Sequence, residues 1–123
     1  MHVLLIEDDD ATRQLLAGHL RASAHQVTAV DSSESATVVV HAWGPPDVVV
    51  SDINLPGLSG MEFTLGLRRR FGPDRLGLVL ISGEHRPPAL ADDDAFAARH
   101  AFLTKPCRSH ELLTAVQLVS PAA

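Results

Sequence analysis

The chain has 123 residues, a formal net charge of −5 at pH 7 and a hydrophobic content of 46%. This length allows one domain with a real hydrophobic core and leaves no room for a second, so residues 1–123 are expected to form a single domain. The acidic balance argues against a protein that binds nucleic acid directly through its charge.

Cysteine usage and the N-terminus bear on the compartment. Cys107 is the only cysteine, so no internal disulfide is possible, and we expect a half-buried structural thiol in a reducing compartment. The chain opens directly into an apolar strand-like run, without a signal peptide or a membrane span. We therefore expect a cytoplasmic protein without a membrane partner.

Short apolar runs alternate along the chain with segments of helical character. The runs predict five strands, at Val3–Ile6, Gln26–Val30, Asp47–Ser51, Leu76–Ile81 and Ala101–Thr104. The other segments predict five helices: Ala11–Ala22, one that stops at Gly44, Met61–Phe71, Leu90–His100 and one that ends at Val119. Strands that alternate with helices require parallel pairing through helical crossovers. The fold class expected is α/β, a doubly wound five-stranded parallel sheet of flavodoxin-like (βα)5 form.

Polar residues near the expected helix starts predict how those helices are capped. The expected caps are Asp9 or Asp10, Asp31 with Glu34, Ser59 with Glu62, and Ser109. The run Arg68–Arg70 lies late in its helix, where cations suit the macrodipole, and we interpret it as a solvated helix end.

Four of the strands end in residues with chemical potential. Glu7 and Asp8 follow the first strand, Asp52 follows the third, Ser82 the fourth and Lys105 the fifth. The carboxyl ends of parallel strands meet at one edge of the sheet, which is where ligands bind in open α/β folds. Taken alone, Asp52 would be a turn or capping residue, but the other strand ends favour a joint site.

Carboxylates gathered in this way repel one another, and a divalent cation with oxygen ligands commonly resolves the repulsion. We expect Mg²⁺, with Asp8 and Asp52 as direct ligands. The backbone carbonyl of Asn54 would supply another oxygen, and Glu7 would hold a coordinated water. With the ion bound, Asp52 could attack a phosphorus atom and form an aspartyl phosphate.

The oxygens of a transferring phosphoryl group need further donors. Lys105 would supply an ammonium and Ser82 a hydroxyl. Lys105 is the only lysine in the chain, which favours a site for a compact point charge over a surface lysine. Asn54 and Glu84 lie two residues beyond Asp52 and Ser82, where they would flank the approach of water and tune dephosphorylation.

Four short motifs, in this order and separation, resemble the receiver domain of two-component response regulators. They are IEDD at Ile6–Asp9, SDINLPGLSG at Ser51–Gly60, ISGE at Ile81–Glu84 and FLTKP at Phe102–Pro106. The resemblance covers the whole chain. It implies that Asp52 is the phosphoacceptor, that a cis peptide bond precedes Pro106, and that the donor is a histidine kinase or a phosphotransfer protein.

The resemblance also implies a switch. Ser82 would move toward the phosphoryl group, Phe102 would turn into the vacated space, and the surface of the fourth helix, Ala101–Thr104 and the last helix would bind a downstream protein. Such a domain phosphorylates and dephosphorylates itself and is not a turnover enzyme. The chain could be a stand-alone receiver or a piece of a longer protein.

Two other functions remain open. An aspartate-nucleophile phosphatase of the haloacid dehalogenase type would use Asp, Lys and Mg²⁺ on a similar sheet. It needs a second aspartate two positions after the nucleophile, where this chain has Asn54. A receiver-like module that docks partners without phosphorylation has little support, because all five strand-end residues are present.

Overall fold

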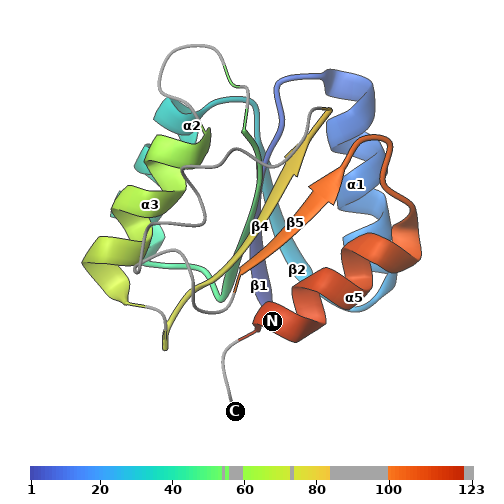
Figure 1. Ribbon diagram of the computed structural model, residues 1–123. Coiled ribbons are helices and arrows are strands. Elements are labelled where there is room, and N and C mark those ends of the chain that lie inside the picture. The colour runs from blue at the N-terminus through green and yellow to red at the C-terminus, as the bar shows by residue number, and fades with distance from the viewer. Residues whose placement is uncertain (54, 56–59, 73, 84–99, 121–123) are drawn as a thin grey trace.

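A five-stranded parallel sheet lies between two layers of helices (Figure 1). The structure is a computed structural model, and it describes residues 1–53, 55, 60–72, 74–83 and 100–120. The strand order is β2-β1-β3-β4-β5, with every neighbouring pair parallel. This is the doubly wound sheet that the alternation of apolar runs and helical segments predicts.

The observed elements match the predicted ones to within a residue or two at most ends. The strands are β1 (His2–Ile6), β2 (Gln26–Val30), β3 (Val48–Asp52), β4 (Gly77–Ser82) and β5 (His100–Thr104). The described helices are α1 (Asp10–Ala22), α2 (Ser33–Trp43), α3 (Gly60–Phe71) and α5 (Ser109–Val119). Strands β3 and β4 extend one residue further than expected, so that Asp52 and Ser82 are the last residues of their strands.

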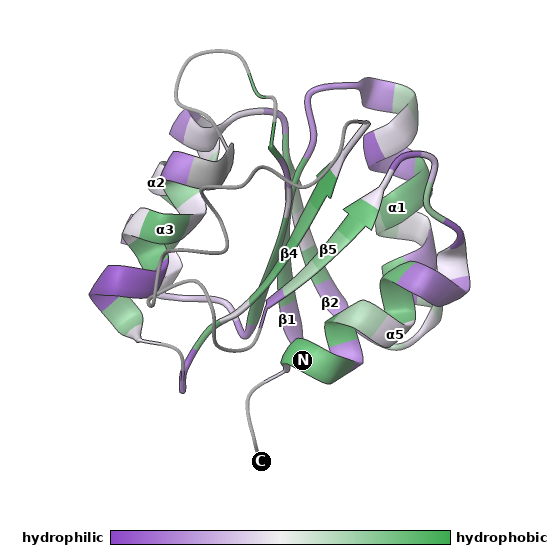
Figure 2. Cartoon of the chain, in the orientation of Figure 1, coloured by the Kyte–Doolittle hydropathy of each residue, from purple (hydrophilic) through white to green (hydrophobic). Residues whose placement is uncertain are grey.

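The two faces of the sheet carry two separate apolar clusters. Leu4, Val49 and Leu78 pack on the side of α2 and α3, while Val3, Val48 and Val79 pack on the side of α1 and α5. Side chains alternate between the faces of a strand, so an apolar run that is covered on both sides needs no polar alternation. The hydropathy colouring shows this as apolar strands between helices with polar outer faces (Figure 2).

Two predicted caps are wrong. Ser32, not Asp31, caps α2, and its Oγ accepts a hydrogen bond of 3.1 Å from the backbone N–H of Ser35. Asp31 lies one residue too early for that role. In α5 the cap position is Arg108, whose backbone N–H donates to Glu111 at 3.0 Å, and Ser109 is the first helical residue.

Two other predicted helix ends are confirmed. Asp9 caps α1 as one of the two residues expected, and Gly44 ends α2 with a φ of 83°. Glycine adopts that left-handed conformation without strain, which explains why the helix stops there. Ser59 lies outside the described residues.

Two further expectations need correction. Arg68 is not part of a solvated helix end: it is only 1% exposed, whereas Arg69 and Arg70 are exposed. It follows Thr64 by one helical turn, on the face that α3 turns toward the sheet. His100 begins β5 and does not end a helix, and the rest of the helix predicted for Leu90–His100 lies outside the described residues.

None of the helices among the described residues is long and apolar enough to cross a membrane.

Candidate functional site

The register of the strands brings the predicted site residues to one edge of the sheet. Ile6 pairs with Ser51, Asp52 with Ile81, and Ser82 with Thr104. Glu7 therefore follows β1 beside Asp52, and Lys105 follows β5 beside Ser82.

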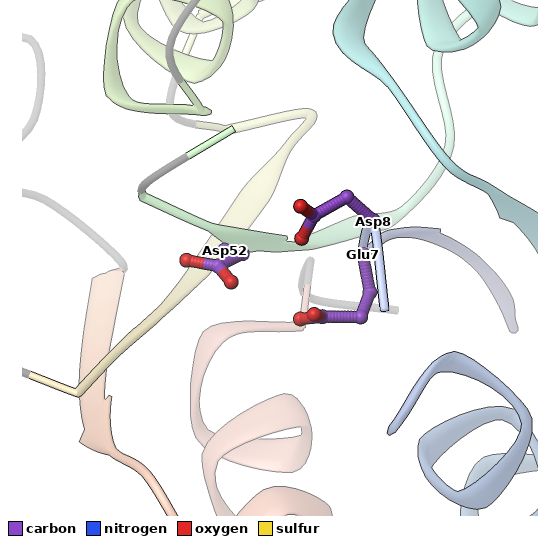
Figure 3. Close-up of side chains that lie close together, drawn as sticks. All are labelled: Glu7, Asp8 and Asp52. Carbon is purple, nitrogen blue, oxygen red and sulfur yellow. The ribbon is translucent and has the colours of Figure 1, made fainter. Parts of the chain in front are cut away.

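Three carboxyl groups meet at this edge. The side chains of Glu7, Asp8 and Asp52 each place one carboxylate oxygen so that all three oxygens lie within 4.8 Å of one another. Figure 3 shows them gathered between the ends of β1 and β3. Glu7 is 1% exposed and Asp52 is 7% exposed, whereas Asp8 is open to solvent. Access from outside is therefore over Asp8.

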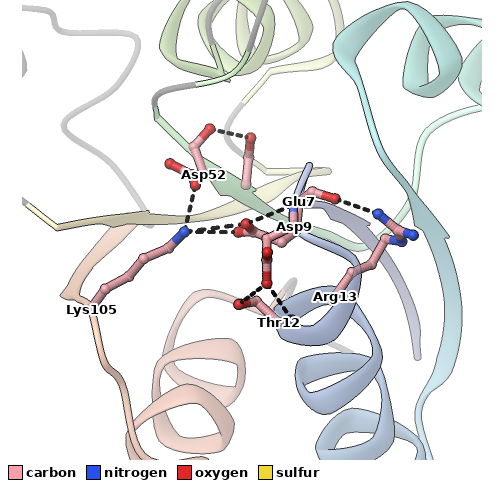
Figure 4. A network of polar contacts seen from close by, with 7 residues as sticks. Glu7, Asp9, Thr12, Arg13, Asp52 and Lys105 are labelled. Carbon is pink, nitrogen blue, oxygen red and sulfur yellow. Dashed lines mark hydrogen bonds and ion pairs between the residues drawn. The ribbon is translucent and has the colours of Figure 1, made fainter.

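Lys105 lies between two of these carboxylates (Figure 4). Its Nζ donates to Oδ2 of Asp52 at 2.6 Å and to Oε1 and Oε2 of Glu7 at 3.2 and 3.1 Å. Burial by itself would lower the pKa of Lys105, but the hydrogen bonds to Asp52 and Glu7 outweigh it and raise the pKa above its usual value. The ammonium is therefore fully charged at neutral pH.

Negative charge still exceeds positive charge in this cluster. Burial, opposed by the hydrogen bond from Lys105 and reinforced by the charge of Asp52, raises the pKa of Glu7. A small, hard cation would relieve this imbalance, because clustered carboxylate oxygens are the donors that Mg²⁺ takes in proteins. The donor set thus fits the expected ion, with Asp8 at the open side.

The loop from β1 into α1 is held by its own hydrogen bonds. Oδ2 of Asp9 accepts from the N–H of Thr12 at 2.8 Å and from its hydroxyl at 2.6 Å, and these bonds lower the pKa of Asp9. Arg13 donates to the backbone carbonyl of Glu7 at 3.0 Å and forms an ion pair with Asp10. The acidic run therefore divides its roles: Asp9 and Asp10 fix the loop, and Glu7 and Asp8 face the site.

The remaining predicted site residues are placed as follows. Ser82 is 2% exposed, and its carbonyl accepts from the N–H of Lys105 at 2.8 Å, which ties the ends of β4 and β5 together. Phe102 is partly buried and packs on the side of α2 and α3. The Lys105–Pro106 peptide bond is cis, as predicted. Asn54 and Glu84 lie outside the described residues.

A hollow of about 380 Å³ borders the cluster on the side of α1. It is lined by Thr12, Leu15, Leu16, Ile81, Lys105, Pro106 and Cys107. The Cys107 thiol is half-buried, as expected, and burial raises its pKa. A raised pKa keeps the thiol protonated and poorly nucleophilic, which agrees with a structural role.

Sequence reasoning missed the contact between Lys105 and Glu7. The lysine was assigned to the incoming phosphoryl group and Glu7 to a water molecule, yet in this structure Lys105 binds both Glu7 and Asp52. The sequence signal that could have predicted this contact is the position of the two consecutive carboxylates after β1. Glu7, the residue directly after the buried strand, is buried beside Lys105, and Asp8, the next one, lies at the solvent-exposed side of the same cluster.

The doubly wound parallel sheet places the protein in the class of flavodoxin-like α/β domains, and a carboxylate cluster and a lysine lie at its carboxyl edge. The sequence comparison gives the family. Residues 3–117 match the family model of the response regulator receiver domain. The chain belongs to this family, whose members are signalling modules rather than conventional enzymes.

Individual relatives agree. The two-component response regulator ORR11 of Oryza sativa is 28% identical over 98% of this chain and 81% of its own length. The transport regulator DctD of Pseudomonas aeruginosa is 36% identical over 94% of this chain but only 24% of its own length. This chain thus spans most of one relative and about a quarter of the other.

Solved structures support the same fold. The chemotaxis response regulator CheY4 of Vibrio cholerae superposes with a TM-score of 0.76 at 25% identity, covering 96% of this chain and 97% of CheY4. The receiver domain of the hybrid histidine kinase CckA gives a TM-score of 0.77 at 26% identity, covering 97% and 98%.

Proposed function

We propose that Asp52 is the phosphoacceptor of a two-component phosphorelay. The observation that carries this proposal is the setting of its carboxylate: it ends the central strand, is 7% exposed, and lies 2.6 Å from the Lys105 ammonium, with Glu7 and Asp8 beside it. A carboxylate can act as a nucleophile toward phosphorus and form an acyl phosphate. The Lys105 ammonium is already placed to donate hydrogen bonds to the oxygens of that product.

Asp8, Asp52, the backbone carbonyl of Asn54 and, through water, Glu7 would hold Mg²⁺. When bound, the ion would neutralise charge on the transferring phosphoryl oxygens. Asp8 is the open ligand and Asp52 the buried one, so the ion and the donor would reach the cluster from the Asp8 side. The tight cluster of three carboxylate oxygens supports this assignment.

The donor is a histidine kinase or a phosphotransfer protein. An Oδ atom of Asp52 attacks the phosphorus of a phosphohistidine, the P–N bond breaks, and the imidazole leaves with the bonding electrons and takes up a proton. Lys105 donates to the phosphoryl oxygens, and the Ser82 hydroxyl donates from the end of β4. The chain's own groups bind, orient and neutralise, which is what phosphoryl transfer requires.

Hydrolysis of the acyl phosphate would end the signal, and we assign its rate to Asn54 and Glu84. In the sequence each follows a site residue by two positions, and there it would flank the approach of an attacking water. Exchanging either for Ala is expected to alter the decay of the adduct without preventing its formation. Unchanged decay in both variants would remove them from the site.

The output is a switch through Ser82 and Phe102. Ser82 would move toward the phosphoryl oxygens, and Phe102, which has no hydroxyl to hold it, would turn inward by packing alone. The changed surface would comprise β5, α5 and the segment before β5, and it would bind a downstream protein. Ser82→Ala is expected to accept phosphate slowly and to change little at this surface. Equal NMR shift changes across Leu90–Val119 in Ser82→Ala and the parent would refute this route.

Intact-mass measurement with acetyl phosphate and Mg²⁺ tests the acceptor. The parent is expected to gain one phosphoryl group, and Asp52→Asn none. Steady release of phosphate from small esters would instead indicate the haloacid dehalogenase-type phosphatase. A parent that never gains the adduct, although folded and supplied with Mg²⁺, would favour a docking module without phosphorylation.

A further inference from the structure

The first residue of α3 lies directly against the backbone of the proposed acceptor. Gly60 is buried, and its N–H donates to the carbonyl of Ile53 at 3.1 Å. The hydroxyl of Thr64, one turn along α3, donates to the carbonyl of Gly60 at 2.8 Å. The start of α3 is therefore fixed on one side to the end of β3 and on the other to its own second turn.

No side chain fits at Gly60. A β-carbon there would overlap the carbonyl oxygen of Asp52, and it would lie 2.9 Å from the Asp52 carbonyl carbon and 2.6 Å from Oγ of Ser51. Two of these three atoms belong to the main chain, which cannot move aside as the end of a flexible side chain can. Any residue other than glycine must push α3 and the end of β3 apart.

The main chain of Asp52 has little freedom to absorb such a push in any other direction. Its carbonyl accepts from Oγ of Ser51 at 3.0 Å, and the next N–H, that of Ile53, donates to the carbonyl of Ile81 at 3.0 Å. The end of β3 is thus hydrogen-bonded to β4, and on another side it packs directly against Gly60.

We propose that Gly60 is a positioning residue for Asp52. The missing side chain lets the end of β3 approach α3, and this approach sets where the Asp52 carboxylate stands relative to Lys105 and Glu7. The inference rests on the proposed function. An aspartate side chain has only two torsions, so a shift of its main chain is passed on to the carboxylate. Displacement of a reacting group by about 1 Å can cost roughly 100-fold in rate.

Two other glycines supply matched controls. Gly66 lies in the same helix, and apart from its chain neighbours and the helix's own backbone no atom of the described residues lies within 4 Å of an added β-carbon. Gly77, at the opposite end of the sheet, is as crowded as Gly60, since its β-carbon would overlap the carbonyl oxygen of Val119. Gly77→Ala therefore imposes a comparable steric clash far from the site.

The experiment compares Gly60→Ala, Gly66→Ala and Gly77→Ala. For each variant the melting temperature, the rate of adduct formation from acetyl phosphate by mass spectrometry, and the Mg²⁺ affinity are measured. Gly60→Ala is expected to form the adduct about 10- to 100-fold more slowly than the parent, per folded molecule, and to bind Mg²⁺ more weakly. Gly77→Ala is expected to melt earlier yet form the adduct at the parent rate per folded molecule. Gly66→Ala is expected to melt later, because alanine is the better helix former.

The outcomes separate this inference from the proposed function. If the parent forms the adduct and Gly60→Ala matches it in rate and Mg²⁺ affinity, the positioning role is wrong. If Gly77→Ala loses as much rate per folded molecule as Gly60→Ala, the effect is one of stability alone, and the inference again fails. If the parent itself forms no adduct, the proposed function fails first.

A milder variant decides the matter if Gly60→Ala does not fold. Ser51→Ala removes the hydroxyl that donates to the Asp52 carbonyl and lies near Gly60, and it leaves the main chain of Asp52 against Gly60. Slower adduct formation by the folded Ser51→Ala protein would support control of the Asp52 main chain. The parent rate in Ser51→Ala would contradict it.

Discussion

Two aspartates flank the same strand and serve opposite purposes. Asp47 precedes β3 at the amino edge of the sheet, and its Oδ2 accepts a hydrogen bond of 2.8 Å from the backbone N–H of His2. Asp52 ends β3 at the carboxyl edge, where its neighbours are Lys105 and two further carboxylates. One carboxylate satisfies the backbone of β1, and the other stands in a cluster of charges.

The difference shows how the direction of a parallel sheet assigns roles to identical residues. At the amino edge, first residues of strands expose N–H groups that a carboxylate can accept from. At the carboxyl edge, loops open away from the sheet, and charged side chains can face one another. Asp47 should therefore matter for stability and Asp52 for chemistry, and each prediction below tests one side of this contrast.

The largest effect is expected at Lys105. Lys105→Ala removes the ammonium that lies 2.6 Å from Asp52, and the rate of adduct formation should fall about 100- to 1,000-fold, as for loss of a key charge-stabilising donor. Phosphorylation kinetics from acetyl phosphate at saturating Mg²⁺ measure this.

Lys105→Arg is the matched control for charge. A guanidinium keeps the positive charge but is bulkier and planar, so it should restore the melting temperature more fully than the rate. A parent rate in Lys105→Arg would show that charge alone suffices and that the compact ammonium has no special place in the site.

The next largest effect is expected in Mg²⁺ binding. Asp8→Ala removes an open carboxylate of the cluster, and the affinity should fall at least about 10-fold. Asp10→Ala, two residues further along the chain, removes an ion pair with Arg13 but no carboxylate of the cluster, so the Mg²⁺ affinity should stay unchanged. Glu7→Ala should weaken binding less than Asp8→Ala does. Titration of the three variants checks the order, and equal affinity of Asp8→Ala and the parent would contradict the assignment.

The carboxyl edge in this contrast was predictable from sequence, whereas the hydrogen bond of Asp47 to His2 was not. The apolar runs predicted the strands because both faces of the sheet are covered, and the residues after those runs, Glu7, Asp52 and Lys105, identified the carboxyl edge. The order of strands along the chain was enough to place them together, since parallel strands end on the same side.

What sequence could not predict depends on distances between main-chain atoms. Nothing in the sequence around Gly60 indicates that a β-carbon at this position would overlap the carbonyl oxygen of Asp52. Arg68 was expected in solvent because arginine usually is, but its place one turn after Thr64 buries it. Ser32 and Asp31 are both good caps, and only the backbone conformation decides for Ser32.

A smaller effect is expected on stability at Asp47. Asp47→Ala leaves the N–H of His2 without its acceptor, which should lower the free energy of unfolding by about 1–2 kcal/mol. Asp47→Asn keeps an acceptor oxygen and should lose less. Urea denaturation measures both variants. Adduct formation per folded molecule should stay at the parent rate. A slower rate in Asp47→Ala would contradict the assignment of Asp47 to stability alone.

The smallest effect is a pH dependence at Glu7. Its pKa in the folded protein is raised above 4.5, chiefly by burial, so the folded state binds the proton more tightly than the unfolded state does. Stability from this group is therefore greatest below 4.5 and is lost as pH rises through the raised pKa. Glu7→Gln lacks this loss.

Thermal unfolding of Glu7→Gln and the parent, at about pH 4 and about pH 7, tests the sign. The variant should gain stability relative to the parent as the pH rises from the lower to the higher value. A relative loss of stability at the higher pH would mean that the ion pair with Lys105 outweighs the cost of burying the Glu7 carboxylate.

Locating the phosphoryl group on the chain tests the central claim most directly. After reaction with acetyl phosphate and Mg²⁺, borohydride reduces an aspartyl phosphate to homoserine, and peptide mass spectrometry reads the position. We expect homoserine at position 52 and unchanged aspartate at positions 8 and 47. Homoserine at position 8 or 47, or aspartate retained at position 52 in the phosphorylated protein, would contradict the account.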